Sequence, residues 1–248
     1  CSERGIAVAQ GTGSPYAPAE LTWALVMAAA RRLPQYIGNL KHGAWQQSGL
    51  KAASMPVNFG MGTVLRGRTM GIWGFGKIGQ LVAGYAKAFG MQVVVWGSEA
   101  SREKAAQQGY IPASTREAFF EQSDVISLHL RLNDATRGIV TLDDLSRMKT
   151  SAMIVNTSRA ELIEPDALIS SLNRGRPGLA AIDVFEHEPI LQGHALLRLE
   201  NCICTPHIGY VEKDNYELYF GAAFDNVVNF IKGTPTNIVN PGALQVRR

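Results

Sequence analysis

The chain has 248 residues, and 24 Lys and Arg against 21 Asp and Glu give it a net charge of +3. Apolar residues make up 46% of it, which excludes a disordered chain as the main state. The longest basic runs are the pairs Arg31-Arg32 and Arg247-Arg248, so the sequence does not indicate a nucleic-acid partner. The best apolar run, residues 21–30, is far shorter than the ~20 residues that cross a bilayer, so we expect no membrane association.

The chain contains three cysteines, Cys1, Cys202 and Cys204. An odd and sparse set of thiols is more typical of the reducing cytoplasm than of a disulfide scaffold, so we expect a cytoplasmic protein. Cys202 and Cys204 alternate on a strand-like run that His207 follows, but no fourth ligand with suitable spacing is evident. We therefore expect no metal site and interpret the two thiols as small apolar side chains of a buried strand.

Short, almost continuous apolar runs recur along the chain, which is the pattern of strands covered on both faces. They predict strands at residues 70–73, 92–96, 124–128, 152–156, 179–184 and 202–205. Segments with helical periodicity lie between most of them, at residues 78–89, 115–122, 142–148 and 165–174. This alternation predicts an α/β fold, a Rossmann-type doubly wound parallel sheet with right-handed crossovers.

Further elements are expected on either side of this unit. Two longer helices are predicted at residues 18–33 and 215–232, and a strand at residues 5–9. Residues 41–68 are rich in Gly and Ser and show no clear period, so we interpret them as an extended arm that leads to the first core strand.

The first core strand leads into the pattern G-x-G-x-x-G at Gly74, Gly76 and Gly79. The pattern follows an apolar strand and opens a helix inside a strand–helix–strand unit, which is the context that indicates a dinucleotide site. Gly74 would make the tight turn, Gly76 would let a pyrophosphate approach the backbone, and Gly79 would let helix and strand pack closely. Backbone N–H groups near Lys77 and Ile78 would bind the phosphates.

The end of the next strand is where such a fold contacts the adenosine ribose. The position usual for an acidic residue holds Gly97, followed by Ser98 and Glu99, with Arg102 nearby. Glu99 could bind the ribose diol of NAD, whereas Ser98 and Arg102 could accommodate the 2′-phosphate of NADP. NAD is favoured as the cofactor, and NADP stays open.

Polar segments follow the later strands, at the edge where open α/β sheets place their ligands. Arg159 can hold a carboxylate bidentately and polarise a neighbouring carbonyl. His207 can move a hydroxyl proton while hydride goes to the nicotinamide, and Glu188 beside it would favour the protonated ring. Asp183 is well placed to take the nicotinamide carboxamide. Further cofactor contacts are expected at Leu130, Thr157 and Gly209.

Together these motifs resemble the D-isomer-specific 2-hydroxyacid dehydrogenase family, which includes D-3-phosphoglycerate, D-lactate, glyoxylate/hydroxypyruvate and formate dehydrogenases. The resemblance rests on Gly74-Phe75-Gly76-Lys77-Ile78-Gly79, Asn156-Thr157-Ser158-Arg159, Asp183-Val184-Phe185-Glu186-His187-Glu188-Pro189 and Thr205-Pro206-His207. It implies an oxidoreductase that transfers hydride between a nicotinamide cofactor and a small D-2-hydroxy acid or 2-keto acid, with Arg159, Glu188 and His207 as the catalytic set. It also implies a homodimer in which the helix at residues 18–33 and the arm after it embrace the partner.

The resemblance further implies two lobes. We expect the dinucleotide-binding domain at residues 15–209, and remnants of the substrate domain at residues 1–14 and 210–248, whose upstream part is absent. Because that upstream lobe normally grips the substrate, this exact chain is expected to bind cofactor but to be catalytically crippled. A non-catalytic, dinucleotide-sensing protein of the same fold, like certain transcriptional corepressors, stays as the alternative function.

Overall fold

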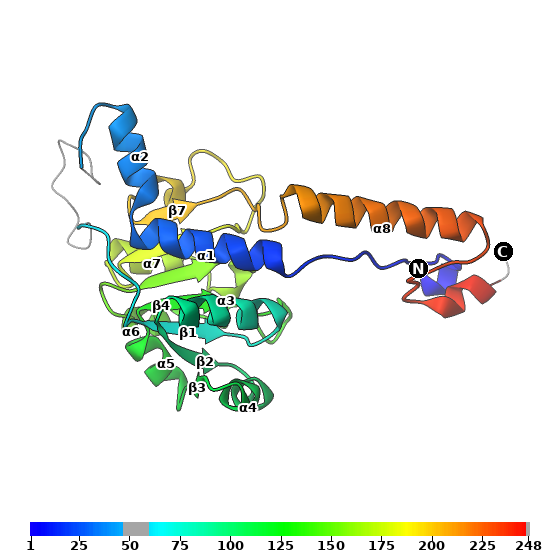
Figure 1. Cartoon of the computed structure of the whole chain (residues 1–248), viewed down its shortest axis with the longest axis horizontal. Helices are drawn as coiled ribbons and strands as arrows, with labels where there is room; N and C mark the ends of the chain where they lie inside the picture. The colour runs from blue at the N-terminus through cyan, green and yellow to red at the C-terminus, as the bar shows by residue number, and fades with distance from the viewer. Residues whose placement is uncertain (47–59, 247–248) are drawn as a thin grey trace. The chain divides into compact units, whose positions relative to one another are not determined.

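The computed structural model describes residues 1–46 and 60–246 (Figure 1). The chain divides into a larger unit, Pro18–Gly209, and a smaller unit that joins Cys1–Ala17 to Tyr210–Arg248. The extended arm predicted at residues 41–68 falls in part on residues 47–59, which lie outside the described residues.

The larger unit is built on one sheet whose strand pairs are all parallel within the described residues. Its strands are β1 (Thr69–Trp73), β2 (Gln92–Trp96), β3 (Ile111–Pro112), β4 (Val125–Leu128), β5 (Met153–Asn156), β6 (Leu179–Ile182) and β7 (Cys202–Cys204). Their order is β3-β2-β1-β4-β5-β6-β7, so the direction of strand addition reverses between β1 and β4. The predicted Rossmann-type, doubly wound parallel sheet is confirmed, and its reversal point is where this fold binds ligands.

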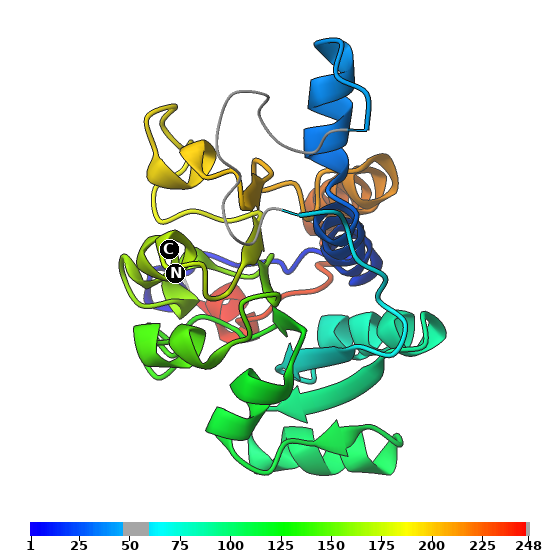
Figure 2. The ribbon, with the colours of Figure 1, turned by 90° about the vertical axis from the view of Figure 1, so that its left-hand side faces the viewer.

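Helices cover both faces of this sheet (Figures 1 and 2). The helices of the larger unit are α1 (Tyr16–Ala30), α2 (Leu33–Lys41), α3 (Lys77–Ala88), α4 (Glu99–Gln107), α5 (Arg116–Gln122), α6 (Leu142–Arg147) and α7 (Ala167–Asn173). Buried side chains of α1, α3 and α4 pack with one face of the strands, and those of α5, α6 and α7 pack with the other. Consecutive residues of the central strands alternate between the two cores, which explains why the strands are apolar throughout.

The helix predicted at residues 18–33 is wrong in its extent. α1 ends at Ala30, Arg32 takes a left-handed conformation with φ +51°, and α2 begins at Leu33. Pro34 explains the break, because its ring would collide with the carbonyl of residue 30 in a continuous helix and it has no N–H to donate.

Other predictions differ for local reasons. The strand predicted at residues 5–9 is irregular apart from a single bridge between Ala9 and Ile238, and a 3₁₀ turn at Ser2–Arg4 precedes it. The Asn240 side chain accepts a hydrogen bond from the Val8 N–H and donates one to the Ile6 carbonyl, so it satisfies part of this backbone in place of a neighbouring strand. The pattern also missed α4, because its sequence has no apolar stripe and Ala105 is its one buried residue.

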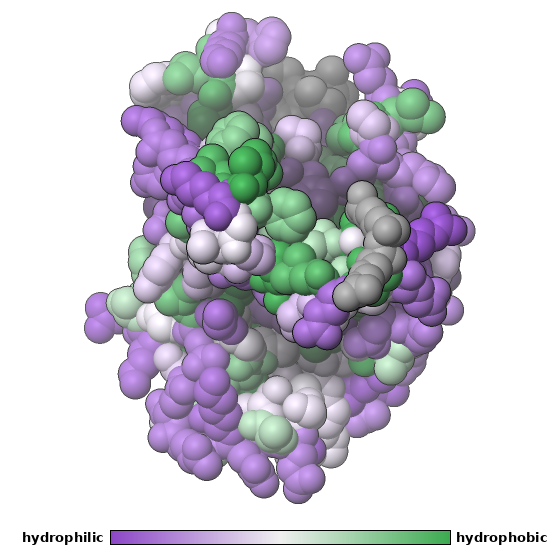
Figure 3. All heavy atoms as spheres, turned by 90° about the vertical axis from the view of Figure 1, so that its right-hand side faces the viewer, coloured by the Kyte–Doolittle hydropathy of each residue, from purple (hydrophilic) through white to green (hydrophobic). Residues whose placement is uncertain are grey.

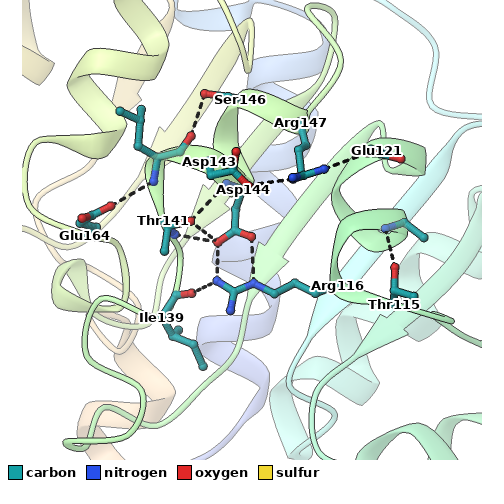
Figure 4. Close-up of polar contacts among 12 residues, drawn as sticks. Thr115, Arg116, Glu121, Ile139, Thr141, Asp143, Asp144, Ser146, Arg147 and Glu164 are labelled. Atoms are coloured by element: carbon teal, nitrogen blue, oxygen red, sulfur yellow. Dashed lines mark hydrogen bonds and ion pairs between the residues drawn. The ribbon is translucent and has the colours of Figure 1, made fainter.

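A buried carboxylate fastens α5 to α6 on one face of the sheet (Figure 4). Asp144 is 5% exposed and accepts a hydrogen bond of 2.8 Å from Nε of Arg116, which makes a second contact through Nη2. The same carboxylate completes a capping box with Thr141 at the start of α6. The Arg116 guanidinium also lies 5.3 Å from the centre of the Trp73 ring, so this network reaches the end of β1.

The smaller unit is organised around α8 (Lys213–Ile231), where a helix was predicted at residues 215–232. Buried Asn226 accepts hydrogen bonds from Thr236 and Asn237 and donates one to the carbonyl of Gln10, which ties three segments together. Exposed apolar side chains of α8 are Tyr216, Leu218, Tyr219, Phe220, Phe224, Val227, Val228, Phe230 and Ile231. Figure 3 views the end of this unit that holds the termini and shows hydrophobic residues gathered there. None of the described helices is long and apolar enough to cross a membrane.

Candidate active site

The glycine turn joins β1 to α3 at the point where the strand order reverses. Gly74 has φ +99°, and a Cβ there would lie 2.6 Å from the carbonyl oxygen of His129 at the end of β4. A Cβ at Gly79 would collide with the carbonyl of Gly74. A Cβ at Gly76 would meet no heavy atom within 4 Å. The fold therefore requires glycine at Gly74 and Gly79, whereas Gly76 borders open space.

The first turn of α3 faces this open space with unpaired backbone donors. Gly76 is the N-cap and supplies no side-chain acceptor, and the helix begins at Lys77. The first N–H groups of a helix, here those of Lys77 and Ile78, have no partner within the helix, and the helix dipole adds partial positive charge. Open space beside such donors fits a dinucleotide pyrophosphate.

The end of β2 shows which ribose contacts are available. Gly97 has φ +150°, and Ser98 is the N-cap of α4, where its Oγ accepts a hydrogen bond from the Ser101 N–H. The Arg102 guanidinium lies 4.9 Å from the centre of the Trp96 ring. Ser98 thus has a structural role in starting α4, and Arg102 is held close to the strand end.

A histidine–glutamate pair lies beyond the ends of β6 and β7. His207 Nδ1 is 2.6 Å from Glu188 Oε2, and Glu188 Oε1 accepts a hydrogen bond of 2.9 Å from the Phe185 N–H. Burial raises the pKa of Glu188, but the hydrogen bonds from His207 and Phe185 and the charges of His207 and Arg159 outweigh it, so the net effect lowers that pKa. Because Glu188 occupies Nδ1 of His207, Nε2 is the ring nitrogen that can contact a substrate. The His207 side chain is 39% exposed, so the ring is accessible.

The loop that carries His207 is fixed by a fully buried carboxylate. Asp183 Oδ1 accepts hydrogen bonds from Thr205 Oγ1 at 2.6 Å and from the Ile208 N–H at 2.9 Å. Its Oδ2 accepts one of 3.0 Å from the Gly209 N–H. These contacts hold the backbone on both sides of His207, whose φ of +51° lies in the sparsely populated left-handed region. Sequence reasoning missed this positioning role, although Thr205 was visible in the motif.

Arg159 follows β5 on a turn that is held by polar contacts. Asn156 Nδ2 donates to the Arg159 carbonyl at 2.8 Å, and Ser158 Oγ donates to the carbonyl of Leu128 at 2.7 Å. The guanidinium is exposed and Nη1 donates to the Ser158 carbonyl at 2.5 Å. Its positive charge contributes to the lowered pKa of Glu188, which places the two side chains in one electrostatic environment.

Two further side chains complete the neighbourhood. The hydroxyls of Thr157 and Thr22 are 2.7 Å apart, which joins the Arg159 turn to the buried face of α1. Thr22 was not predicted from the sequence. The only feature that could have indicated it is that Thr22 is a polar residue within a largely apolar helix. Burial lowers the pKa of His129 to about 4, so this ring is neutral at physiological pH and not suited to carry a proton. Leu130 follows it, half-buried against the core.

Within the described residues, no group of three or more His, Cys, Asp or Glu side chains is arranged to hold a metal ion. Cys202 and Cys204 lie together, with their Sγ atoms 3.7 Å apart, and His207 is engaged with Glu188. The residues present therefore fit a nicotinamide dinucleotide at the glycine turn and acid–base chemistry at the His207 loop.

Comparison with known proteins gives a consistent picture. Residues 23–209 match the family described as D-isomer specific 2-hydroxyacid dehydrogenase, NAD binding domain. A crystal structure from Ralstonia solanacearum, provisionally assigned as a D-3-phosphoglycerate dehydrogenase oxidoreductase, is 64% identical with a TM-score of 0.93, over 98% of this chain and 71% of that one. A phosphoglycerate oxidoreductase from Vibrio cholerae is 55% identical with a TM-score of 0.84, over 90% of this chain and 69% of that one.

Curated relatives carry related names. A glyoxylate reductase from Aeropyrum pernix is 36% identical over 94% of this chain and 68% of its own length. A D-3-phosphoglycerate dehydrogenase from Methanocaldococcus jannaschii is 34% identical over 96% of this chain, which spans 44% of that protein. These names are those of reductases and dehydrogenases, and nothing in the comparisons supports the non-catalytic alternative. NAD is the cofactor that the matching domain binds. The chain belongs to the D-isomer-specific 2-hydroxyacid dehydrogenase family of NAD-dependent oxidoreductases.

Proposed function

We propose that Arg159, Glu188 and His207 are the catalytic residues for the interconversion of a small D-2-hydroxy acid and the corresponding 2-keto acid in the protein with its substrate lobe complete. The observation that carries the proposal is the 2.6 Å contact between His207 Nδ1 and Glu188 Oε2, at the sheet edge where the glycine turn also lies. A carboxylate on one ring nitrogen fixes the tautomer and leaves the other nitrogen available to a substrate oxygen.

In the direction of keto-acid reduction, protonated His207 donates its Nε2 proton to the keto oxygen, and in the reverse direction the neutral ring accepts the hydroxyl proton. Glu188 stabilises the protonated ring by its charge and holds the ring plane through the Nδ1 hydrogen bond. Arg159 binds the substrate carboxylate, and its fork of donors orients the carbonyl beside it. When bound, NADH supplies the hydride that reaches the carbonyl carbon.

The cofactor site is proposed on the residues that border the glycine turn and the neighbouring strand ends. The open space at Gly76 and the helix N–H groups support binding of the pyrophosphate there. The residues proposed to contact the cofactor are Gly74, Gly76, Lys77, Ile78, Gly79, Ser98, Leu130, Thr157, Asp183 and Gly209. The three hydrogen bonds that Asp183 accepts from the His207 loop leave it with limited capacity toward the nicotinamide carboxamide.

The proposed assembly is a cytoplasmic homodimer with two lobes per subunit, the larger lobe at residues 15–209. Exposed apolar side chains on α2, namely Leu33, Ile37 and Leu40, support a subunit contact at this helix. The cytoplasmic location is supported by the sparse, unpaired cysteines.

Oxidation of NADH in the presence of a panel of 2-keto acids tests the proposed reaction. We expect consumption that depends on the keto acid and the D-isomer of the hydroxy acid as product. In a protein whose substrate lobe is complete and whose His207–Glu188 contact is intact by NMR, binding of NADH without consumption with any 2-keto acid would contradict the proposal.

A further inference from the structure

Two thiols on the edge strand of the sheet take no part in the proposed reaction. Cys202 and Cys204 are the first and last residues of β7, which is the final strand in the sheet order and pairs with β6. Their Sγ atoms lie 3.7 Å apart, and both side chains are half-buried. Cys1, the third thiol, is exposed and lies in the smaller unit.

The strand geometry brings the two sulfurs together and limits how they can be bonded. Residues two apart on a strand point to the same face, and both thiols pack against the core on the side of α5, α6 and α7. Their Cα atoms are about 6.6 Å apart at the usual strand rise, which is at the upper end of the range in which disulfides form. A bond between them is therefore feasible but strained, and strained disulfides are readily reduced.

The environments of the two sulfurs differ. The hydrogen bond between the thiols and burial raise the pKa of Cys202, whereas the same hydrogen bond lowers the pKa of Cys204. Cys204 Sγ also lies 3.8 Å from the Leu196 carbonyl oxygen, to which its thiol can donate. The opposite pKa shifts favour Cys204 as the thiol that ionises first. A thiolate next to a second thiol is the arrangement of a nucleophile with a resolving partner.

We propose that Cys202 and Cys204 are a modification site, a reversible dithiol–disulfide pair that hydrogen peroxide oxidises. The Cys204 thiolate attacks a peroxide oxygen, which forms an S–O bond, breaks the O–O bond and releases hydroxide that is protonated to water. The Cys202 sulfur, having lost its proton, then attacks the sulfur of the Cys204 sulfenic acid, which forms the S–S bond and breaks the S–O bond. The hydroxide that leaves takes up the proton from Cys202 and becomes a second water. Two thiols are oxidised to one disulfide, and one peroxide is reduced to two waters.

Oxidation would alter the segment that carries His207. Bond formation draws the sulfurs from 3.7 Å to about 2.05 Å, so β7 must bend next to Thr205. Thr205 is bonded to Asp183, and the left-handed conformation of His207 depends on that anchored loop. A lower turnover of the oxidised form is therefore expected, and this consequence, unlike the sulfur chemistry, rests on the proposed function.

The test uses the Cys1→Ser variant, so that only the pair can react, and treats it with hydrogen peroxide. Intact-mass analysis and alkylation should show both thiols lost together, with the mass of two hydrogens lost, no oxygen retained, and full reversal by dithiothreitol. With Cys202→Ser added, Cys204 should retain one oxygen that dimedone traps. With Cys204→Ser added instead, peroxide consumption should be at least about tenfold slower. Oxygen addition to both sulfurs without hydrogen loss, or a disulfide between two chains, would overturn the proposal.

Turnover measured on the same samples separates the two parts of the inference. It should fall in proportion to the disulfide fraction in Cys1→Ser and stay constant in the variant that also carries Cys204→Ser. A disulfide that forms with unchanged turnover would overturn the coupling to His207. A disulfide that forms in a protein without turnover in either redox state would count against the proposed function instead, because sulfur oxidation does not depend on it.

Discussion

A side chain at Gly76 should block the cofactor without preventing the protein from folding. We therefore predict that Gly76→Val loses dinucleotide binding in a folded protein. A Cβ at this position meets no heavy atom within 4 Å, and its φ of −78° suits any residue. Because Gly76 is the N-cap of α3, the free energy of unfolding should fall by about 1 kcal/mol or less, the usual cost of a poorer cap.

The effect on binding follows from the donors that the valine would cover. A pyrophosphate kept away from the helix start loses hydrogen bonds from the Lys77 and Ile78 N–H groups. Hydrogen bonds to charged groups contribute about 1.5–3 kcal/mol each, so the loss of two amounts to at least about 3 kcal/mol. Since 1.4 kcal/mol is tenfold in affinity, the Kd for NAD should rise by at least about 100-fold.

Isothermal titration calorimetry with NAD, paired with chemical denaturation, checks this prediction. Gly84→Ala is the matched control, because Gly84 lies inside the same helix and its Cβ also meets no heavy atom within 4 Å. It should raise the free energy of unfolding by about 0.5–1 kcal/mol and leave NAD affinity unchanged. An unchanged Kd in folded Gly76→Val would refute the assignment of the site.

Four other changes test separate parts of the structure. His207→Ala should lower turnover about 10²–10⁴-fold at unchanged NADH affinity, as steady-state kinetics and titration can show together. Glu188→Gln keeps a hydrogen-bond acceptor for His207 Nδ1 but removes the negative charge, so turnover in keto-acid reduction should fall at unchanged NADH affinity; unchanged turnover would discard the role of that charge. Asp144→Ala removes the carboxylate that pairs with the half-buried Arg116 and breaks the capping box with Thr141, so urea denaturation should show a loss of about 3 kcal/mol. Burial lowers the pKa of His129 from 6.5 to about 4, so between these pH values the unfolded chain binds a proton that the folded chain does not. The free energy of unfolding should therefore fall by about 2–3 kcal/mol as the pH drops from 6.5 to 4. In His129→Gln, the free energy of unfolding should depend less on pH over this range.

The parallel sheet and the glycine turn could be predicted because their patterns are local. Buried strands such as β2 are apolar at nearly every position. Gly74, Gly76 and Gly79 all lie close together, in the turn after β1 and the first turn of α3, so their spacing can be recognised in the sequence. The position of His207 after the last strand likewise follows from parallel topology, since the carboxyl ends of such strands share an edge.

What could not be predicted depends on contacts between distant segments. The three hydrogen bonds by which Asp183 holds the loop of His207 could not be predicted, because no sequence pattern shows where a buried carboxylate points. The division of the first long helix at Arg32 was missed although Pro34 signalled it. The closeness of the Cys202 and Cys204 sulfurs depends on side-chain rotamers, which the spacing alone leaves open.

The central claim is that the His207–Glu188 pair moves the proton while bound NADH reduces a 2-keto acid. Single-turnover oxidation of NADH, started by adding a 2-keto acid to the NADH-loaded protein, tests it most directly in wild type and His207→Ala. We expect both proteins to bind NADH equally and the variant to oxidise it about 10²–10⁴-fold more slowly. Equal single-turnover rates in the two proteins would show that His207 does not move the proton.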